Sequence, residues 1–537
     1  MKLATASTAV FFLAIASPAF AQDEDTNRCA ALAERAIAGG RIEAAVLVRP
    51  DDRQPIEAFG VPPLPAGASY CRVSTTLTPT TASSIRSEVW LPLPTDWNGK
   101  LLAVGNGGYG GSLGGPRLAM RPAVRQGYVV AGTDMGHVED GSDGKNAEWA
   151  LNQPDLIVDF AYRANHLTAV LAKELALAFY GRAHSHAYFQ GCSDGGREAL
   201  MAVQRYPEDF DGVIAGAPAN AWPRLMTSFA WTWKVAHERS ESRLTPANLA
   251  YIQSAVMAKC DELDGIKDGV IDDPRQCRFD PAVVECDKDP STGCLTAPQL
   301  LALRALYQGP RHPGSGQSIM PGFTPGGEGL SSGWDLWITG TDAQQPAFAR
   351  SFYANFVFND PAWTMADFDL EAAFASGEAA MGDIIASDEV NLSAFASRGG
   401  KLILHHGWVD AAIPAEATIT YYEAVRAEMG EAVTDDFLRL FMAPGVGHCF
   451  GGPGPSNLPL LEALDVWVET DSAPNSIIAS KYANDYAPLL GLPTGDPVRQ
   501  RPVCAWPQVA TWTREGSSDD PAVFTCQAPL APTTERR

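Results

Sequence analysis

Short apolar runs that end at glycine- or acid-bearing turns recur along the chain, at residues 100–104, 127–131, 187–190, 212–216, 401–405 and 438–442. Between them, residues 156–180 repeat Ala, Leu and Val every three to four positions, which predicts a helix, and a second helix is predicted over 197–204. Short buried strands that alternate with helices are typical of a mostly parallel sheet covered on both faces. Active sites in such α/β sheets gather at the carboxyl ends of the strands.

The pattern changes between residues 219 and 390. This stretch is rich in Trp, Phe, Asp, Gly and Pro, contains four cysteines, and lacks the alternation of strand, turn and helix. We predict an inserted lid domain over 219–390, which interrupts a core formed by residues 22–218 and 391–537. The Trp and Cys content of the insertion argues against a floppy segment.

The first 21 residues have the features of a secretory signal peptide. An apolar run at 9–16 follows Lys2, and Ala19-Phe20-Ala21 forms a small-x-small cleavage site before Gln22. The run is too short to span a bilayer, which needs roughly 20 apolar residues, and no later stretch reaches that length. We therefore expect a secreted or periplasmic protein without a membrane partner; the alternative is a buried N-terminal helix.

Charge and cysteine content narrow the function classes further. The formal net charge of −23 excludes the basic face that nucleic acid or an anionic membrane would need. Ten cysteines in an exported chain indicate five disulfides. Sequence alone leaves the pairing open, but spacing favours Cys29 with Cys71, Cys260 with Cys277, Cys286 with Cys294, and Cys504 with Cys526, which leaves Cys192 and Cys449.

The segment Gly191-Cys192-Ser193-Asp194-Gly195 matches the pattern G-x-S-x-G. It follows a predicted strand and precedes a predicted helix, the context of the nucleophile elbow in α/β-hydrolases. Small residues at both flanks allow the sharp turn that exposes the hydroxyl of Ser193. The pattern predicts an α/β-hydrolase fold with Ser193 as nucleophile; the alternative is a glycine-rich turn without chemistry.

A serine nucleophile needs a base and an orienting acid, and in this fold the chain order is Ser, acid, His. Among the histidines, His448 follows the late strand at 438–442 and lies in a glycine-rich loop. Asp410 follows the strand at 401–405 and would hold the imidazole tautomer. We interpret His405 and His406, at the end of that strand, as structural residues with satisfied hydrogen bonds.

The oxyanion hole requires two backbone N–H donors. One is expected from Asp194, directly after the nucleophile, and the other from the glycine-rich turn 105–111, where we select Gly107, with Gly108 as the nearest alternative. A phosphate-binding loop is excluded, because no Lys-Ser/Thr pair follows these glycines.

Cys192 precedes the nucleophile and Cys449 follows the base, so a disulfide between them is predicted; the alternative is a pair of reactive thiols. This Cys-Ser…Asp…His-Cys arrangement resembles the tannase and feruloyl esterase family, which also includes mono(2-hydroxyethyl) terephthalate hydrolase. The resemblance covers essentially the whole mature chain and extends to the motifs at 105–108, 133–137, 191–197 and 447–449. It implies an α/β-hydrolase core, a large lid, and cleavage of aromatic acid esters without an organic cofactor.

Residues 260–270 form an acid-rich loop with two glycine turns, and carboxylates at this spacing suit a hard cation such as Ca²⁺. The loop lacks the pattern of an EF-hand. The resemblance implies a structural calcium ion that stabilises the lid, and it carries the ligand positions onto the side chains of Asp261, Asp264 and Asp268 and the carbonyls of Ile266 and Val270. The alternative is a solvated acidic turn.

The combined prediction is a secreted serine esterase that acts on small esters of hydroxycinnamic, gallic or related aromatic acids. Activity on mono(2-hydroxyethyl) terephthalate is one alternative, with Arg350 as a candidate partner for the free carboxylate. The other is a secreted binding protein on an inactive hydrolase scaffold, against which the intact triad order argues. An aromatic substrate wall or a lid core would explain Trp334, Trp337, Phe352, Tyr353, Phe356, Phe358 and Trp363.

Overall fold

The computed structural model describes residues 18–58, 60–138, 144–286 and 293–529. Most of the predicted signal segment therefore lies outside the described residues, and α1 (Pro18–Ala30) begins inside that segment. Within these ranges, no helix is long and apolar enough to cross a bilayer.

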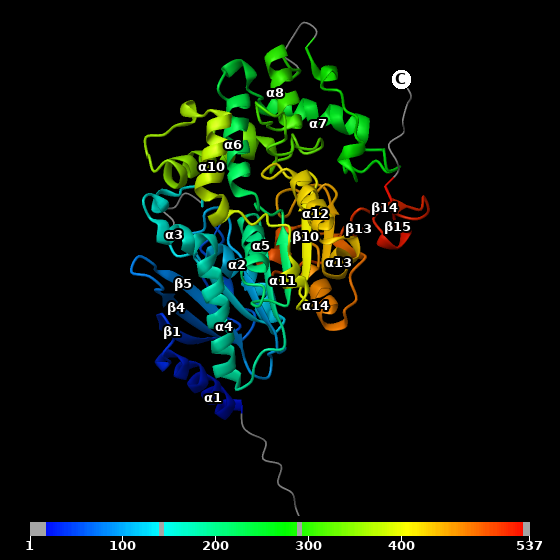
Figure 1. The fold of residues 1–537 in the computed structure, drawn as a ribbon. Helices are drawn as coiled ribbons and strands as arrows, with labels where there is room; N and C mark the ends of the chain where they lie inside the picture. The colour runs from blue at the N-terminus through cyan, green and yellow to red at the C-terminus, as the bar shows by residue number, and fades with distance from the viewer. Residues whose placement is uncertain (1–17, 59, 139–143, 287–292, 530–537) are drawn as a thin grey trace, which may run out of the picture.

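A nine-stranded sheet forms the centre of the described fold (Figure 1). In spatial order its strands are β1 (Gly40–Val48), β4 (Tyr70–Leu77), β5 (Ile85–Pro92), β7 (Val129–Thr133), β6 (Leu101–Val104), β8 (Ala187–Cys192), β9 (Gly212–Gly216), β10 (Lys401–Gly407) and β11 (Leu438–Ala443). Pairing is parallel from β7 to β11 and antiparallel among β1, β4, β5 and β7. All the predicted apolar runs are strands of the parallel part, so the predicted α/β-hydrolase sheet is confirmed.

Helices cover both faces of the sheet. Along β6, Leu101 and Ala103 pack into one core and Leu102 and Val104 into the other, because successive side chains of a strand point to opposite faces. The first face is covered by α4 (Ala164–Tyr180), α5 (Asp194–Arg205) and α12 (Ala415–Met429), and the second by α2 (Gly114–Arg125) and α14 (Leu460–Thr470). This double burial explains why the parallel strands are continuous apolar runs.

The predicted helix over 156–180 is formed in three parts: α3 (Pro154–Val158), a π-helical turn (Asp159–Arg163), and α4. Gly181 ends α4 in the left-handed conformation, with φ of 70°, as helix C-termini often do. The second predicted helix begins earlier than residue 197, since α5 starts at Asp194, directly after Ser193.

The chain between β9 and β10 is largely helical and lies above the sheet in Figure 1. Its main helices are α6 (Trp222–Ala236), α7 (Pro246–Cys260), α8 (Ala297–Gln308), α9 (Gln344–Ser351) and α10 (Leu370–Ile385). Side chains of α6 and α9 share one continuous core with the α4–α5 face of the sheet. The helices α7 and α8 contribute to a further core, separate from the two cores of the sheet.

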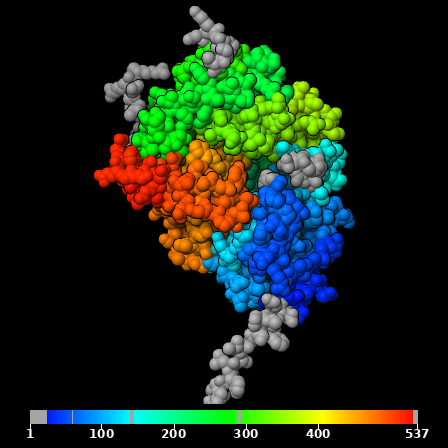
Figure 2. All heavy atoms as spheres, turned by 180° about the vertical axis from the view of Figure 1, so that it is seen from behind, coloured from blue at the N-terminus to red at the C-terminus, as the bar shows by residue number. Residues whose placement is uncertain are grey.

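Beyond α14, the chain forms small antiparallel pairs: β12 (Ser476–Lys481) with β13 (Arg499–Cys504), and β14 (Val509–Trp512) with β15 (Phe524–Gln527). The sequence pattern did not predict them, because each is short, with four to six residues, and none is a continuous apolar run. Figure 2 shows this C-terminal region lying against the inserted segment. The remaining short elements are β2 (Arg53–Gln54), β3 (Leu64–Pro65), α11 (Ser393–Ala396), α13 (Glu431–Phe437) and α15 (Tyr486–Leu490).

The five predicted disulfide pairings are all present, which resolves the alternatives that spacing left open. They join Cys29 with Cys71, Cys192 with Cys449, Cys260 with Cys277, Cys286 with Cys294, and Cys504 with Cys526.

Candidate active site

Ser193 occupies a sharp turn between β8 and α5. Its φ of 65° and ψ of −122° are strained for a residue with a side chain, and the turn is held by the Ser193 N–H, which donates to the Gly216 carbonyl at 3.0 Å. A Cβ on Gly191 would lie 2.2 Å from the Gly195 carbonyl oxygen. The flanking glycines are therefore required by the close approach of the backbone, which is the geometry of a nucleophile elbow.

His448 and Asp410 form a hydrogen-bonded pair at the ends of neighbouring parallel strands. The distance between His448 Nδ1 and Asp410 Oδ2 is 2.7 Å, and the Asp410 side chain is fully buried. Because an ionised carboxylate only accepts, Nδ1 carries the proton and Nε2 is left with its lone pair. The His448 side chain retains partial exposure, whereas that of Asp410 has none.

Asp410 is surrounded by donors. Its Oδ1 accepts the backbone N–H groups of Ala412 and Ile413 at 2.7 and 2.9 Å, while Oδ2 also accepts from His406 Nε2 at 3.1 Å. Burial opposes ionisation, but the charge of His448 and the hydrogen bonds from both histidines hold the pKa of Asp410 below its usual range. The carboxylate is thus ionised and fixed in orientation.

His406 has the structural role that the sequence predicted. Its Nε2 faces two acceptors, Asp410 Oδ2 and the Ile413 carbonyl, so Nε2 carries a proton and Nδ1 accepts from the Thr418 hydroxyl at 2.7 Å. This imidazole is fully buried and supports the carboxylate rather than facing the nucleophile. Burial lowers the pKa of the neighbouring His405 to about 4.

The Cys192–Cys449 disulfide joins the elbow to the histidine loop. Its Cα atoms are 5.9 Å apart, and its two cysteines are the direct neighbours of Ser193 and His448. Both residues are partly exposed, unlike Asp410. The disulfide links the neighbours of Ser193 and His448, and the hydrogen bond from His448 links Asp410 to the same end of the sheet, although Asp410 lies 217 positions after Ser193 and 38 before His448.

The predicted oxyanion donors lie on two segments that touch. A Cβ on Gly195 would lie 2.7 Å from the Asn106 carbonyl oxygen, so the glycine turn sits directly on the start of α5. The N–H of Asp194 belongs to the first turn of α5, whose amides have no intrahelical acceptor. Gly107 is exposed, and its N–H donates to the Asn106 side-chain oxygen at 2.9 Å. An incoming oxyanion would replace this local bond.

One residue of this site, Glu198, was not identified from the sequence. The backbone N–H of Asn106 donates to Glu198 Oε2 at 3.0 Å, and Glu198 is buried in the second turn of α5. Nothing in the sequence distinguishes Glu198 from other helix-surface glutamates. Its burial is a consequence of α5 packing against the glycine turn.

One aromatic residue of the inserted segment reaches the triad region. Trp337 is half-buried and lies edge-on to His448, with 5.1 Å between the ring centroids. The other candidates for a substrate wall belong mostly to the core: Trp334, Phe352, Tyr353, Phe356 and Trp363 are buried, and Phe358 is exposed. Arg350 is exposed on α9.

The acid-rich loop is closed by the Cys260–Cys277 disulfide. Asp261 Oδ1 accepts the N–H groups of Asp268 and Gly269 at 3.2 and 2.9 Å, and Asp264 Oδ1 accepts that of Ile266 at 2.8 Å. In the part of the chain that the structure describes, no three His, Cys, Asp or Glu side chains are grouped so as to hold a metal ion.

Two observations bear on whether this loop suits a cation. Asp264 Oδ2 is buried and has no hydrogen-bond partner among the described residues, and its carboxyl lies beside that of Asp272, which the sequence analysis had not selected. Burial, followed by the charge of Asp264, raises the pKa of Asp272 well above its usual range. Asp268 Oδ2 is engaged differently, by Arg499 and Arg501 of β13 at 3.1 and 2.7 Å. The orphaned oxygen of Asp264 and the adjacent Asp272 carboxyl group are the features of this loop that suit a hard cation, whereas Asp268 is already paired with two arginines.

The chain matches one family of known proteins. Residues 71–527 match the family model described as tannase and feruloyl esterase. An uncharacterized esterase of Xanthomonas campestris is 38% identical over 514 residues, which cover 88% of this chain and 87% of that protein. Mono(2-hydroxyethyl) terephthalate hydrolase of Piscinibacter sakaiensis is 32% identical over 499 residues, 82% of this chain and 81% of that protein.

The fold agrees with these matches. The crystal structure of feruloyl esterase B from Aspergillus oryzae superposes with a TM-score of 0.84 at 28% identity, covering 94% of this chain and 100% of that chain. The chain therefore belongs to the tannase and feruloyl esterase family, and the protein is a carboxylic ester hydrolase with an α/β-hydrolase fold.

Proposed function

We propose that the protein is a secreted serine esterase that hydrolyses esters of aromatic acids of the hydroxycinnamic or gallic type. The observation that carries this proposal is the Cys192–Cys449 disulfide, which joins the residue before Ser193 to the residue after the Asp410-bound His448. The family assignment supplies the substrate class.

In the proposed mechanism, Ser193 attacks the ester carbonyl carbon while His448 Nε2 takes the hydroxyl proton. Asp410 stabilises the imidazolium and keeps its Nδ1–H directed away from the substrate. The N–H groups of Gly107 and Asp194 receive the oxyanion. His448 then protonates the leaving alcohol, and a water activated by the same imidazole releases the aromatic acid from Ser193.

We assign the role of a lid to residues 219–390. Support comes from Trp337, which reaches from this segment to the edge of the His448 ring, and from the core that α6 and α9 share with the sheet. An aromatic acyl group bound at Ser193 would find a ring of matching character beside the base.

We also propose that the loop at 260–270 binds a structural calcium ion. The side chains of Asp261, Asp264 and Asp268 and the carbonyl oxygens of Ile266 and Val270 would hold it. The ion would offset the repulsion between neighbouring buried acids and stabilise the segment, without a part in the chemical steps. The orphaned Asp264 Oδ2 supports this assignment.

The test is hydrolysis of methyl ferulate, methyl gallate and mono(2-hydroxyethyl) terephthalate by the wild type and by Ser193→Ala. We expect turnover of the ferulate or gallate ester, lost in the variant. A preference for the terephthalate monoester would support the second candidate, which the Piscinibacter relative favours. Failure on all three substrates would favour a binding protein on a hydrolase scaffold.

Export is tested separately. The protein recovered from the medium or periplasm of an expressing bacterium should begin at Gln22, as measured by N-terminal sequencing. Retention in the cytoplasm with residues 1–21 intact would contradict the proposed signal peptide.

A further inference from the structure

Glu198 connects the two segments from which the oxyanion donors come. Its Oε2 accepts the backbone N–H of Asn106 at 3.0 Å, and Asn106 directly precedes Gly107. Its carboxyl group also lies beside the carboxyl group of Asp194. A single side chain thus bonds to the glycine turn through Oε2 and lies next to the residue that follows Ser193.

The buried oxygens around Glu198 indicate a proton on its carboxyl group. Asp194 forms a buried ion pair with Arg197 through Oδ1. Within the described residues, Glu198 Oε1 and Asp194 Oδ2 are both buried without a hydrogen-bond partner. Two carboxylate oxygens only accept, so a proton carried by Glu198 satisfies both atoms at once.

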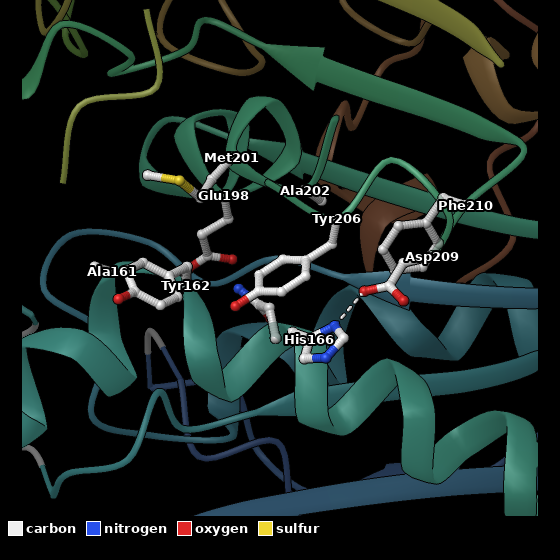
Figure 3. A pocket seen from close by; sticks show the side chains of 10 residues that line it. Ala161, Tyr162, His166, Glu198, Met201, Ala202, Tyr206, Asp209 and Phe210 are labelled. Atoms are coloured by element: carbon white, nitrogen blue, oxygen red, sulfur yellow. Dashed lines mark hydrogen bonds and ion pairs between the residues drawn. The ribbon is translucent and has the colours of Figure 1, made fainter. Parts of the chain in front are cut away.

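The surroundings of Glu198 agree with a neutral carboxyl. Burial, followed by the charge of Asp194, raises the pKa of Glu198 well above its usual range, and the charge of Arg197 only partly opposes this. The side chain lines a cavity of about 10 Å³ behind α5, together with Tyr162 and His166 (Figure 3). That volume holds about one water molecule, too little to solvate a carboxylate.

The glycine turn at Gly105 packs so closely on the start of α5 that neither segment can move towards the other without a steric clash. A Cβ on Gly105 would lie 2.6 Å from the Gly195 Cα and 2.8 Å from Glu198 Oε2. The turn and the helix therefore approach each other as closely as glycine permits, and the hydrogen bond from Asn106 to Glu198 fixes how far the turn slides along α5. A shift of this turn would move the N–H of Gly107 relative to that of Asp194.

We propose that Glu198 is a positioning residue whose carboxyl group ties the Asn106 backbone to Asp194 and holds the two oxyanion donors in register. This inference rests on the proposed function, in which Gly107 and Asp194 stabilise the oxyanion. Glu198 itself touches neither the substrate nor the reacting atoms.

The test compares Glu198→Gln with Glu198→Leu. Glutamine keeps an acceptor for the Asn106 N–H and a donor for Asp194, whereas leucine removes both. With p-nitrophenyl acetate, we expect Glu198→Gln to retain kcat within about threefold, and Glu198→Leu to lose about 10- to 100-fold in kcat with KM changed less than about threefold. Wild-type kcat in Glu198→Leu, or an equal loss in both variants, would overturn the proposal.

A second measurement covers the case in which Glu198→Leu does not fold. The infrared spectrum of the wild type near neutral pH should contain the carbonyl band of a protonated carboxylic acid that disappears in Glu198→Gln. The comparison is needed because Glu328 is also a buried acid with a raised pKa. An unchanged band intensity in Glu198→Gln would contradict the proposed proton on the Glu198 carboxyl group.

The acetate ester separates this inference from the proposed function. It reports on the elbow and the oxyanion hole whatever acyl group the pocket prefers. If the wild type cleaves p-nitrophenyl acetate but not methyl ferulate or methyl gallate, the proposed substrate class is wrong. The comparison of kcat in Glu198→Gln and Glu198→Leu still tests whether Glu198 positions the oxyanion donors. If Ser193→Ala keeps the acetate activity, the proposed nucleophile fails, independently of the infrared result.

Discussion

Cys192 and Cys449 lie 5.9 Å apart at their Cα atoms, although 257 positions separate them in the chain. Each borders a residue of the proposed triad, and Ser193 and Cys449 both have positive φ, a conformation that side chains rarely adopt. The covalent bond restrains these two strained turns against each other. The disulfide therefore restrains the distance between Ser193 and His448, in addition to any restraint from the packing of the inserted segment.

Removal of this disulfide should affect both stability and catalysis. For the double variant Cys192→Ser/Cys449→Ser, we expect a loss of about 2–4 kcal/mol in the free energy of unfolding. We expect kcat to fall at least about tenfold, because the histidine loop gains freedom relative to Ser193. Urea unfolding and steady-state kinetics on p-nitrophenyl acetate measure the two effects.

The matched control is Cys504→Ser/Cys526→Ser, which removes the disulfide between β13 and β15. This pair should lower stability by a smaller amount, because it closes a loop of 22 rather than 257 positions, and it should leave kcat near the wild-type value. Equal losses of kcat in the two double variants would show that the Cys192–Cys449 bond has no specific role at the active site.

The Asp410→Asn variant should lose the orientation of the His448 imidazole while the protein still folds. Asparagine cannot accept all four hydrogen bonds that reach the carboxylate and cannot stabilise the imidazolium of His448. We expect kcat to fall by about 10⁴-fold, as for an orienting aspartate in a serine triad. A variant that folds by circular dichroism and keeps more than a tenth of wild-type kcat would exclude Asp410 from the triad.

The same variant should alter the acid limb of stability. The native pKa of Asp410 is lowered below the unfolded value of about 3.9, so its contribution is present above that pH and is lost as the pH falls towards the native pKa. Between about pH 5 and pH 3, the free energy of unfolding should therefore fall less steeply in Asp410→Asn than in the wild type. Parallel curves from urea unfolding at each pH would contradict this.

Two glycines of the same turn should respond differently to alanine. A Cβ on Gly105 would meet the Gly195 Cα and Glu198 Oε2 within 3 Å, so Gly105→Ala should cost about 1–3 kcal/mol in stability and most of the activity. No atom lies within 4 Å of a Cβ on Gly107, and its φ is not positive. Gly107→Ala should keep the melting temperature within about 1 °C, and a larger loss than in Gly105→Ala would contradict the packing described.

Removal of calcium should lower stability without a change in the catalytic groups. We expect a chelator to lower the melting temperature by several degrees and added Ca²⁺ to restore it, because the ion binds the native loop and not the unfolded chain. In Asp264→Asn, the shift should be lost, since this variant removes the orphaned oxygen from the site. If neither the chelator nor added Ca²⁺ changes the melting temperature of the wild type, the proposed metal site is wrong.

Local pattern predicted the parallel half of the sheet and the elbow. The strands from β6 to β11 are buried on both faces, so they appear as uninterrupted apolar runs. Gly191 and Gly195 are glycines because the backbone approaches them too closely for any side chain. The chain order of Ser193, Asp410 and His448 was also readable, because each follows a strand whose carboxyl end lies at the same edge.

Contacts between distant segments were decided only by the tertiary structure. The strands β1, β4 and β5 carry polar and half-exposed positions, and their antiparallel pairing depends on partners elsewhere in the chain. Asp272 and Glu198 look like ordinary surface acids in the sequence. Glu198 becomes buried because α5 packs on the glycine turn, and Asp272 lies half-buried beside the acid-rich loop, where Arg501 of β13 pairs with Asp268. These tertiary surroundings, rather than residue type, raise the pKa of both carboxyl groups.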